Sequence, residues 1–230
     1  MIEPSTIKFL KELEKNNNRD WFQANKKAFL AAQDNVAALA GYLIGEIGKF
    51  DSAVSGLDPK SCVFRIYRDI RFSKDKSPYK TNLGAHISPG GRKSMQPGYY
   101  IHIQPGQCFV AAGKHMPDAA ELLKIRTAIN AKPKDFLGIV EKRAFREKFG
   151  ELHGDRLSRP PKGFSDDSPV IEYLKLKSFT VYCEYRNNKL ITSADFPKQV
   201  VQDLKAMFPL VDYLRRVRAW ALVLLPPSRS

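Results

Sequence analysis

The chain has 230 residues, of which 43% are hydrophobic and 27% are charged, and its 38 Lys and Arg residues outnumber 24 Asp and Glu residues to give a net charge of +14. This apolar fraction supplies a sizeable core and excludes a disordered, collagenous or low-complexity chain. The longest uninterrupted apolar run, Ala219 to Leu225, is far shorter than the ~20 residues of a membrane helix. We therefore expect a soluble protein with no membrane partner.

The cysteines and the N-terminus bear on location. Cys62, Cys108 and Cys183 are odd in number, widely spaced and set among apolar residues, which is typical of buried thiols in a reducing compartment. The first residues carry no apolar leader, so we expect a cytoplasmic protein. No Cys-x-x-Cys or His-x-x-x-His pair occurs, and we expect no metal site. The sequence also lacks a dinucleotide-binding fingerprint and a phosphate loop, so no cofactor is predicted.

Apolar residues at helical spacing predict two helices in the first fifty residues. The first is expected to begin with an N-cap at Ser5-Thr6 and to end before Asn16. The second is expected to run from Phe22 to about Phe50.

From Val63 to Phe72 the side chains alternate between apolar and polar, which predicts a half-buried strand. The apolar face would carry Phe64, Ile66, Ile70 and Phe72, and the polar face would carry Arg65, Tyr67, Asp69 and Arg71. A break is expected from Ser73 to Pro78.

Short apolar runs between Pro-Gly turns predict further strands, at 83–87, 99–103, 108–113 and 179–185. Helical patterns follow at 117–129, 133–149, 196–207 and 210–223, the last two joined by a hinge at Pro209. Together these elements predict an α+β fold: a central, mostly antiparallel sheet with a meander in its middle, covered by helices from the N- and C-terminal regions. We expect one domain over residues 1–230.

Positive charge concentrates in residues 61–115, where nine basic and two acidic side chains give a net charge of +7. Arginine presents a planar fork of donors that suits phosphate, and flexible lysines can close over an anion. If the strands are neighbours, the polar side chains of one sheet face would converge with two histidines. The candidate anion-binding residues are Arg65, Tyr67, Asp69, Arg71, Lys74, Lys76, Lys80, His86 and His102.

Three functions remain open at this point. The cluster suits a small anionic ligand such as a nucleotide, but an exposed basic stripe would equally suit nucleic acid. Alternatively, Asp69 holds Arg65 and Arg71 in an internal ion-pair network, and the protein is a structural or protein-interaction module. Acid–base chemistry by His86 or His102 with Asp69 is conceivable, yet no nucleophile stands beside them and no reaction is predicted.

The central segment also carries a family resemblance. The run Phe64-Arg65-Ile66-Tyr67-Arg68-Asp69, continued by Arg71 to Lys76 and by Pro78-Tyr79-Lys80, resembles the signature of a bacterial family catalogued only as a conserved domain of unknown function. Further similar pieces are Asn17 to Phe22, Gly98-Tyr99-Tyr100, Gly113 to Pro117 and Leu123 to Arg126. The resemblance covers nearly the whole chain and implies a single domain, but no activity, substrate or cofactor. His115 and Ser168 depart from the family pattern, so neither is expected to be catalytic.

Overall fold

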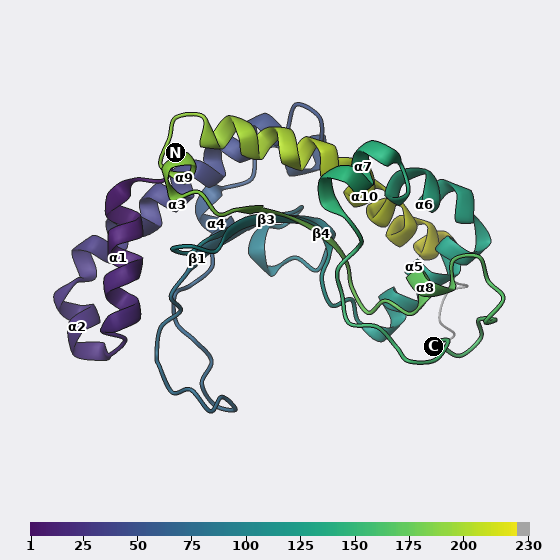
Figure 1. The fold of residues 1–230 in the computed structure, drawn as a ribbon, viewed down its shortest axis with the longest axis horizontal. Helices are drawn as coiled ribbons and strands as arrows, with labels where there is room; N and C mark the ends of the chain where they lie inside the picture. Colours follow the sequence, from purple (N-terminus) through teal and green to yellow (C-terminus); the bar gives the residue numbers. More distant parts are fainter. Residues whose placement is uncertain (225–230) are drawn as a thin grey trace. The chain divides into compact units, whose positions relative to one another are not determined.

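The computed structural model describes residues 1–224, without the side chains of residue 188 and residues 218–224. The side chains of the apolar run from Ala219 to Leu225 therefore lie outside the described residues. The helices are α1 (Pro4–Lys15), α2 (Arg19–Ala24), α3 (Lys26–Ile47), α4 (Pro59–Cys62), α5 (Ala119–Ala131), α6 (Pro133–Val140), α7 (Arg143–Phe149), α8 (Ile171–Leu174), α9 (Asn188–Ile191) and α10 (Phe196–Leu224), with 3-10 turns η1 (Ser52–Val54) and η2 (Gly91–Lys93) (Figure 1).

Four strands form one antiparallel sheet, in the order β1-β2-β3-β4. The strands are β1 (Leu83–Ile87), β2 (Gly98–Ile103), β3 (Cys108–Lys114) and β4 (Phe179–Tyr185). This confirms the predicted α+β class and the strands expected at 83–87, 99–103, 108–113 and 179–185. In the register of β1 and β2, Gly84 lies opposite His102 and His86 lies opposite Tyr100.

The chain divides into two compact units by its backbone contacts. The first comprises Met1–Ser94, Tyr99–Val110 and Glu184–Lys205, and the second comprises Met95–Gly98, Ala111–Cys183 and the chain from Ala206 onward. The single domain expected over residues 1–230 stays a prediction. The candidate anion-binding residues all belong to the first unit.

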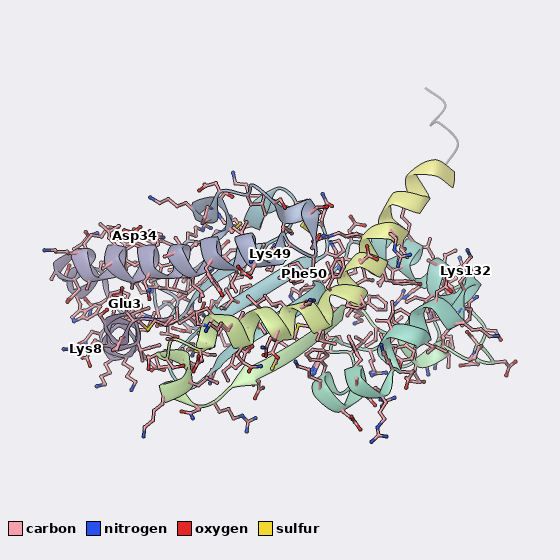
Figure 2. The ribbon with its side chains drawn as sticks, turned by 90° about the horizontal axis from the view of Figure 1, so that it is seen from above. Glu3, Lys8, Asp34, Lys49, Phe50 and Lys132 are labelled. Atoms are coloured by element: carbon pink, nitrogen blue, oxygen red, sulfur yellow. The ribbon has the colours of Figure 1, made fainter. Side chains whose placement is uncertain are left out.

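In the first unit, one face of the sheet packs against the core, and the side chains on the other face are half-buried. Ala85, Ile101 and Ile103 are buried on the face that α3 covers. Figure 2 looks down on this side, where α3 carries Asp34 and the chain continues past its end to Lys49. Because side chains alternate along a strand, the residues between these positions point to the opposite face.

The predicted strand at 63–72 is wrong. Val63 forms one isolated bridge with Ala85, and the chain then leaves the sheet. In Figure 1 the segment between α4 and β1 extends away from the sheet, on the side opposite α3. The expected alternation fails with it, since Phe72 is 96% exposed instead of buried. Beyond Phe64 the segment pairs with its own returning half, so it gains no place in the sheet.

Two N-terminal helix boundaries also differ from expectation. The first helix begins at Pro4, and the hydroxyl of Thr6 donates to Asn35 Oδ1 at 2.9 Å instead of capping the helix. The second predicted helix is divided at Asn25, whose side-chain amide donates to the carbonyl of Trp21 at 2.9 Å and ends α2.

Two later helix predictions need correction as well. The segment expected as one helix over 133–149 is divided between α6 and α7, because Lys142 takes an extended conformation (φ −58°, ψ 127°). The two helices expected at 196–207 and 210–223 form one helix, α10, which contains Pro209. Proline removes one helical hydrogen bond, and here Pro209 is exposed to solvent.

Candidate functional site

The signature segment folds as a two-stranded arm, defined here as residues 64–80. Its two halves meet in an isolated bridge between Tyr67 and Tyr79, and the Lys80 amide donates to the Ile66 carbonyl at 2.8 Å. These backbone bonds fix which outgoing residue lies beside which returning residue. The residues around Phe72 form the tip of the arm.

A clamp from the N-terminal helices holds the base of the arm. The side-chain amide of Asn17 donates to the Tyr79 carbonyl at 2.9 Å and accepts from the Tyr79 amide at 3.1 Å, as a neighbouring strand would. The Phe22 ring stacks on the Tyr79 ring with 3.9 Å between centroids. Asn18 accepts from the Trp21 amide at 2.9 Å and caps α2, which places Phe22. These contacts of Asn17 and Phe22 with Tyr79, called the clamp, fix the base of the arm against the N-terminal helices.

Both carboxylates of the arm are engaged by arginines. Asp69 accepts two bonds from the Arg71 guanidinium, at 2.9 and 2.7 Å, and Asp75 pairs with Arg68. Hydrogen bonds from Arg71 hold the pKa of Asp69 below its usual value, and the charge of Arg65 adds a smaller contribution. The prediction that Asp69 bridges two arginines is therefore right for Arg71 and wrong for Arg65.

Four cations of the arm remain without a carboxylate partner among the described residues: Arg65, Lys74, Lys76 and Lys80. Lys76 donates only to the Ile70 carbonyl, at 3.1 Å. Partial burial lowers the pKa of Lys80, and the like charge of Arg65 lowers it further. Both effects disfavour the charged lysine, and an anion placed near Lys80 and Arg65 would relieve them.

Toward each end of the arm the chain carries two of these cations and one phenylalanine. At the base station, defined as Arg65, Lys80 and Phe64, the Lys80 ammonium lies 5.5 Å from the centre of the half-buried Phe64 ring. The tip station, defined as Lys74, Lys76 and Phe72, places its ring almost entirely in water.

The open face of the sheet continues the aromatic surface from the base station. Ring centres are 6.0 Å apart for Phe64 and Tyr100, and 5.8 Å apart for Tyr100 and Phe109. His102 stacks on Phe109 at 4.6 Å with 12° between the ring planes. These four half-buried rings are called the aromatic face. His86 lies opposite Tyr100 in the register, so His86 and His102 occupy the same face of the sheet.

Gly84 lets Tyr100 lie close to the sheet. A methyl group at Gly84 would stand 2.7 Å from the Tyr100 hydroxyl oxygen and 2.9 Å from the Ile101 carbonyl oxygen. A glycine at this register position therefore sets the place of the Tyr100 ring on the aromatic face.

Both ring nitrogens of His102 have hydrogen-bond partners. The Tyr100 hydroxyl lies 2.9 Å from Nδ1, and Nε2 lies 3.0 Å from the side-chain oxygen Oε1 of Gln104. Since that oxygen only accepts, Nε2 carries the proton and Nδ1 accepts from Tyr100. Burial lowers the pKa of His102, against a smaller raising effect of Gln104. Both nitrogens are occupied, so the acid–base pair with Asp69 that the sequence suggested is not formed.

The lowered pKa of His102 predicts a pH-dependent stability. The unfolded chain takes up this proton near pH 6.5, above the pKa of the folded state, so the stabilisation is complete above that pH and is lost as the pH falls toward the folded pKa. His102→Gln should therefore reduce the loss of unfolding free energy between about pH 7.5 and about pH 5. Urea denaturation at both pH values measures it, with the exposed His115→Gln as control. An unchanged pH dependence in His102→Gln would contradict this assignment.

The other predicted site residues do not converge. The Tyr67 ring faces Phe22 and Tyr79 at the clamp, with centroid distances of 6.2 and 5.5 Å. Asp69 and Arg71 lie toward the tip, and 76% of the Arg71 side chain is exposed. A single polar field joining the signature residues to the histidines is therefore absent from the described structure.

Sequence reasoning missed the aromatic part of the site. The sequence predicts that Phe64 and Phe72 are buried on one strand face, whereas Phe64 is half-buried beside Lys80 and Phe72 is exposed. Tyr100 and Phe109 were assigned to strands without a role. The period-two spacing of Tyr100 and His102 indicates that both side chains lie on the face of the sheet opposite the core, and this spacing could have revealed the aromatic face.

Neither a metal site nor a membrane segment is found in the described residues. No group of three or more His, Cys, Asp or Glu side chains is placed to hold a metal ion there. None of the helices in this part of the chain has the length and apolar character needed to cross a membrane.

The fold and the arm define an α+β protein with a four-stranded antiparallel sheet and a clamped basic arm. The chain belongs to DUF2461, a family of conserved hypothetical proteins of unknown function, whose family model matches residues 5–213. This agrees with the resemblance of the signature segment. No curated protein matches the chain, and no solved structure matches it.

Proposed function

We propose that this protein binds a phosphate-containing ligand at the base station. The observation that carries the proposal is the pair of neighbouring cations, Arg65 and Lys80, which have no carboxylate partner among the described residues. The Lys80 ammonium also lies 5.5 Å from the centre of the Phe64 ring. A phosphate would compensate both charges, since anions pair with guanidinium and ammonium groups by charge-assisted hydrogen bonds.

The aromatic face favours a ligand that also contains a planar ring. Tyr100 and Phe64 stand edge to face at 6.0 Å, and the stacked rings of His102 and Phe109 extend the surface. Rings of this kind stack on nucleobases and place them by their flat faces. A nucleotide therefore fits the base station better than inorganic phosphate alone.

The competing structural interpretation accounts for only part of the arm. In the pairs Asp69–Arg71 and Asp75–Arg68 each charge meets its partner; the first pair is largely exposed and the second is partly exposed. Exposed ion pairs contribute only about 0–1 kcal/mol to stability. The two base-station cations stand outside these pairs, so an internal network gives no reason for their proximity.

Binding of nucleoside monophosphates tests the proposal by calorimetry. We expect wild type to bind and Arg65→Ala/Lys80→Ala to weaken the affinity at least about tenfold, as for the loss of charged hydrogen bonds. Lys134→Ala/Lys162→Ala removes the same charge from exposed positions of the second unit and should leave the affinity unchanged.

Two results would overturn the proposal. One is no heat of binding with any monophosphate. The other is equal affinity in wild type and Arg65→Ala/Lys80→Ala. If the base-station variant also melts at a much lower temperature than wild type, the structural interpretation is favoured.

A cytoplasmic location belongs to the same proposal. It is supported by Cys62, Cys108 and Cys183, none of which takes part in a disulfide bond. Nucleotides and nucleic acids are abundant phosphate ligands in that compartment.

A further inference from the structure

The two stations lie at opposite ends of one arm. Phe72 at the tip lies six positions along the chain from Ile66, where the halves meet near the base. An extended chain of this length spans at most about 20 Å. That distance corresponds to roughly six steps of a stacked nucleic-acid strand at 3.4 Å each. A strand of several nucleotides is therefore long enough to contact both stations.

We infer that the ligand is single-stranded nucleic acid, with one phosphate near the base station and another near the tip station. This inference rests on the proposed function, because it extends the same phosphate site along the arm. Four cations remain after Asp69 and Asp75 have each paired with one arginine. Arg65 and Lys80 are neighbours near the base, and Lys74 and Lys76 lie in the chain close to Phe72. A nucleic-acid strand, whose phosphates repeat along its length, could place one phosphate at each set of cations.

The aromatic rings favour a single strand over a duplex. Phe72 is 96% exposed, and water solvates an apolar ring of this size unfavourably. A nucleobase stacked on Phe72 would remove part of that surface from water. Bases of a duplex are already stacked on each other, whereas those of a single strand offer free faces to protein rings. The aromatic face next to the base station offers a second surface of the same kind.

The tip is held in shape by its own contacts. Asp75 binds Arg68 and accepts from the Ser77 amide at 2.9 Å and from its hydroxyl at 2.6 Å. The Ser77 hydroxyl and Arg68 lower the pKa of Asp75, which keeps this carboxylate ionised. Lys76 closes onto the Ile70 carbonyl at 3.1 Å. A tip ordered in advance loses less entropy when it binds a strand.

The test measures fluorescence anisotropy with labelled oligothymidylates of increasing length, and with a duplex of equal length, over a range of salt. Affinity should rise with strand length until the strand spans both stations. For two neutralised phosphates, one at each station, the slope of log affinity against log salt should be about −1.4 on single strands. Lys74→Ala/Lys76→Ala removes the cations of the tip station and should reduce the slope to about −0.7.

A second variant separates stacking from charge. Phe72→Ala should weaken oligonucleotide binding by about tenfold or more and leave the salt slope unchanged, because a base loses its stacking partner but no phosphate contact is removed. Neither tip variant should alter the affinity for a mononucleotide. Lys134→Ala/Lys162→Ala, with the same net charge as the double lysine variant, should bind oligonucleotides as wild type does.

Each failure has a distinct meaning. If mononucleotides bind but affinity does not rise with strand length, this inference is overturned and the proposed function stands. If the duplex binds more tightly than the single strand, the assignment to single strands is overturned. If neither mononucleotides nor oligonucleotides bind, both proposals fall together.

Discussion

Phe22→Ala is expected to lower the free energy of unfolding by about 3–5 kcal/mol, the range for emptying a buried phenylalanine site. Phe22 is fully buried and touches three rings, with centroid distances of 3.9 Å to Tyr79, 5.1 Å to Phe29 and 6.2 Å to Tyr67. The substitution removes the hydrophobic half of the clamp while Asn17 keeps its two hydrogen bonds to Tyr79. Equilibrium urea denaturation measures the loss.

Phe72→Ala is the matched control, since it deletes the same ring from an exposed position. Its unfolding free energy should remain within about 0.5 kcal/mol of wild type, as for most surface substitutions. A loss below about 1 kcal/mol in Phe22→Ala would mean that the arm is not anchored through this ring.

The second large effect concerns Gly113 in β3, within the second unit. Its φ of +124° is strained for any residue with a side chain, and an added Cβ would stand 2.0 Å from the carbonyl oxygen of Phe179. That oxygen belongs to the neighbouring strand β4 and cannot move without disturbing the strand pairing. Gly113→Ala should therefore cost at least about 3 kcal/mol, from backbone strain together with overpacking.

Gly138→Ala provides the control for Gly113→Ala. Gly138 lies in α6, and a methyl group there would meet no atom within 4 Å. Alanine favours the helix, so this variant should be more stable than wild type by about 0.5–1 kcal/mol. Thermal melting of both variants checks the pair. A Gly113→Ala protein that melts like wild type would contradict the close approach of β3 and β4.

The sheet could be predicted from the sequence because period-two alternation coincides there with tight turns. Ile101 and Ile103 alternate with Tyr100 and His102, and Pro-Gly turns bound the strands. The same spacing sets the two histidine positions on one face, which the register of β1 and β2 confirms.

The arm could not be predicted because alternation records side-chain chemistry and not the strand partner. Tyr67 pairs with Tyr79 instead of with the sheet, so the apolar residues beyond it have no common core to face. Ile66 is buried near the base, whereas Phe72 at the tip is in water. In the sequence pattern alone, Ile66 and Phe72 belong to the same apolar face.

The contacts of the clamp could not be predicted from the sequence because Asn17 and Tyr79 lie 62 residues apart. No local spacing rule reports a contact at such separation. The family resemblance did contain both parts, in the pieces Asn17 to Phe22 and Pro78 to Lys80, but as separate runs. The structure joins them and gives Asn17 and Phe22 a physical role in fixing the arm.

The most direct measurement is an amide chemical-shift map of the wild-type protein titrated first with a nucleoside monophosphate and then with an oligothymidylate. The monophosphate should shift resonances of Arg65, Lys80, Tyr100 and His102, and the oligonucleotide should add those of the tip from Phe72 to Lys76. Shifts confined to surfaces away from the arm, or none at all with either ligand, would contradict the assignment of phosphate binding to residues 64–80.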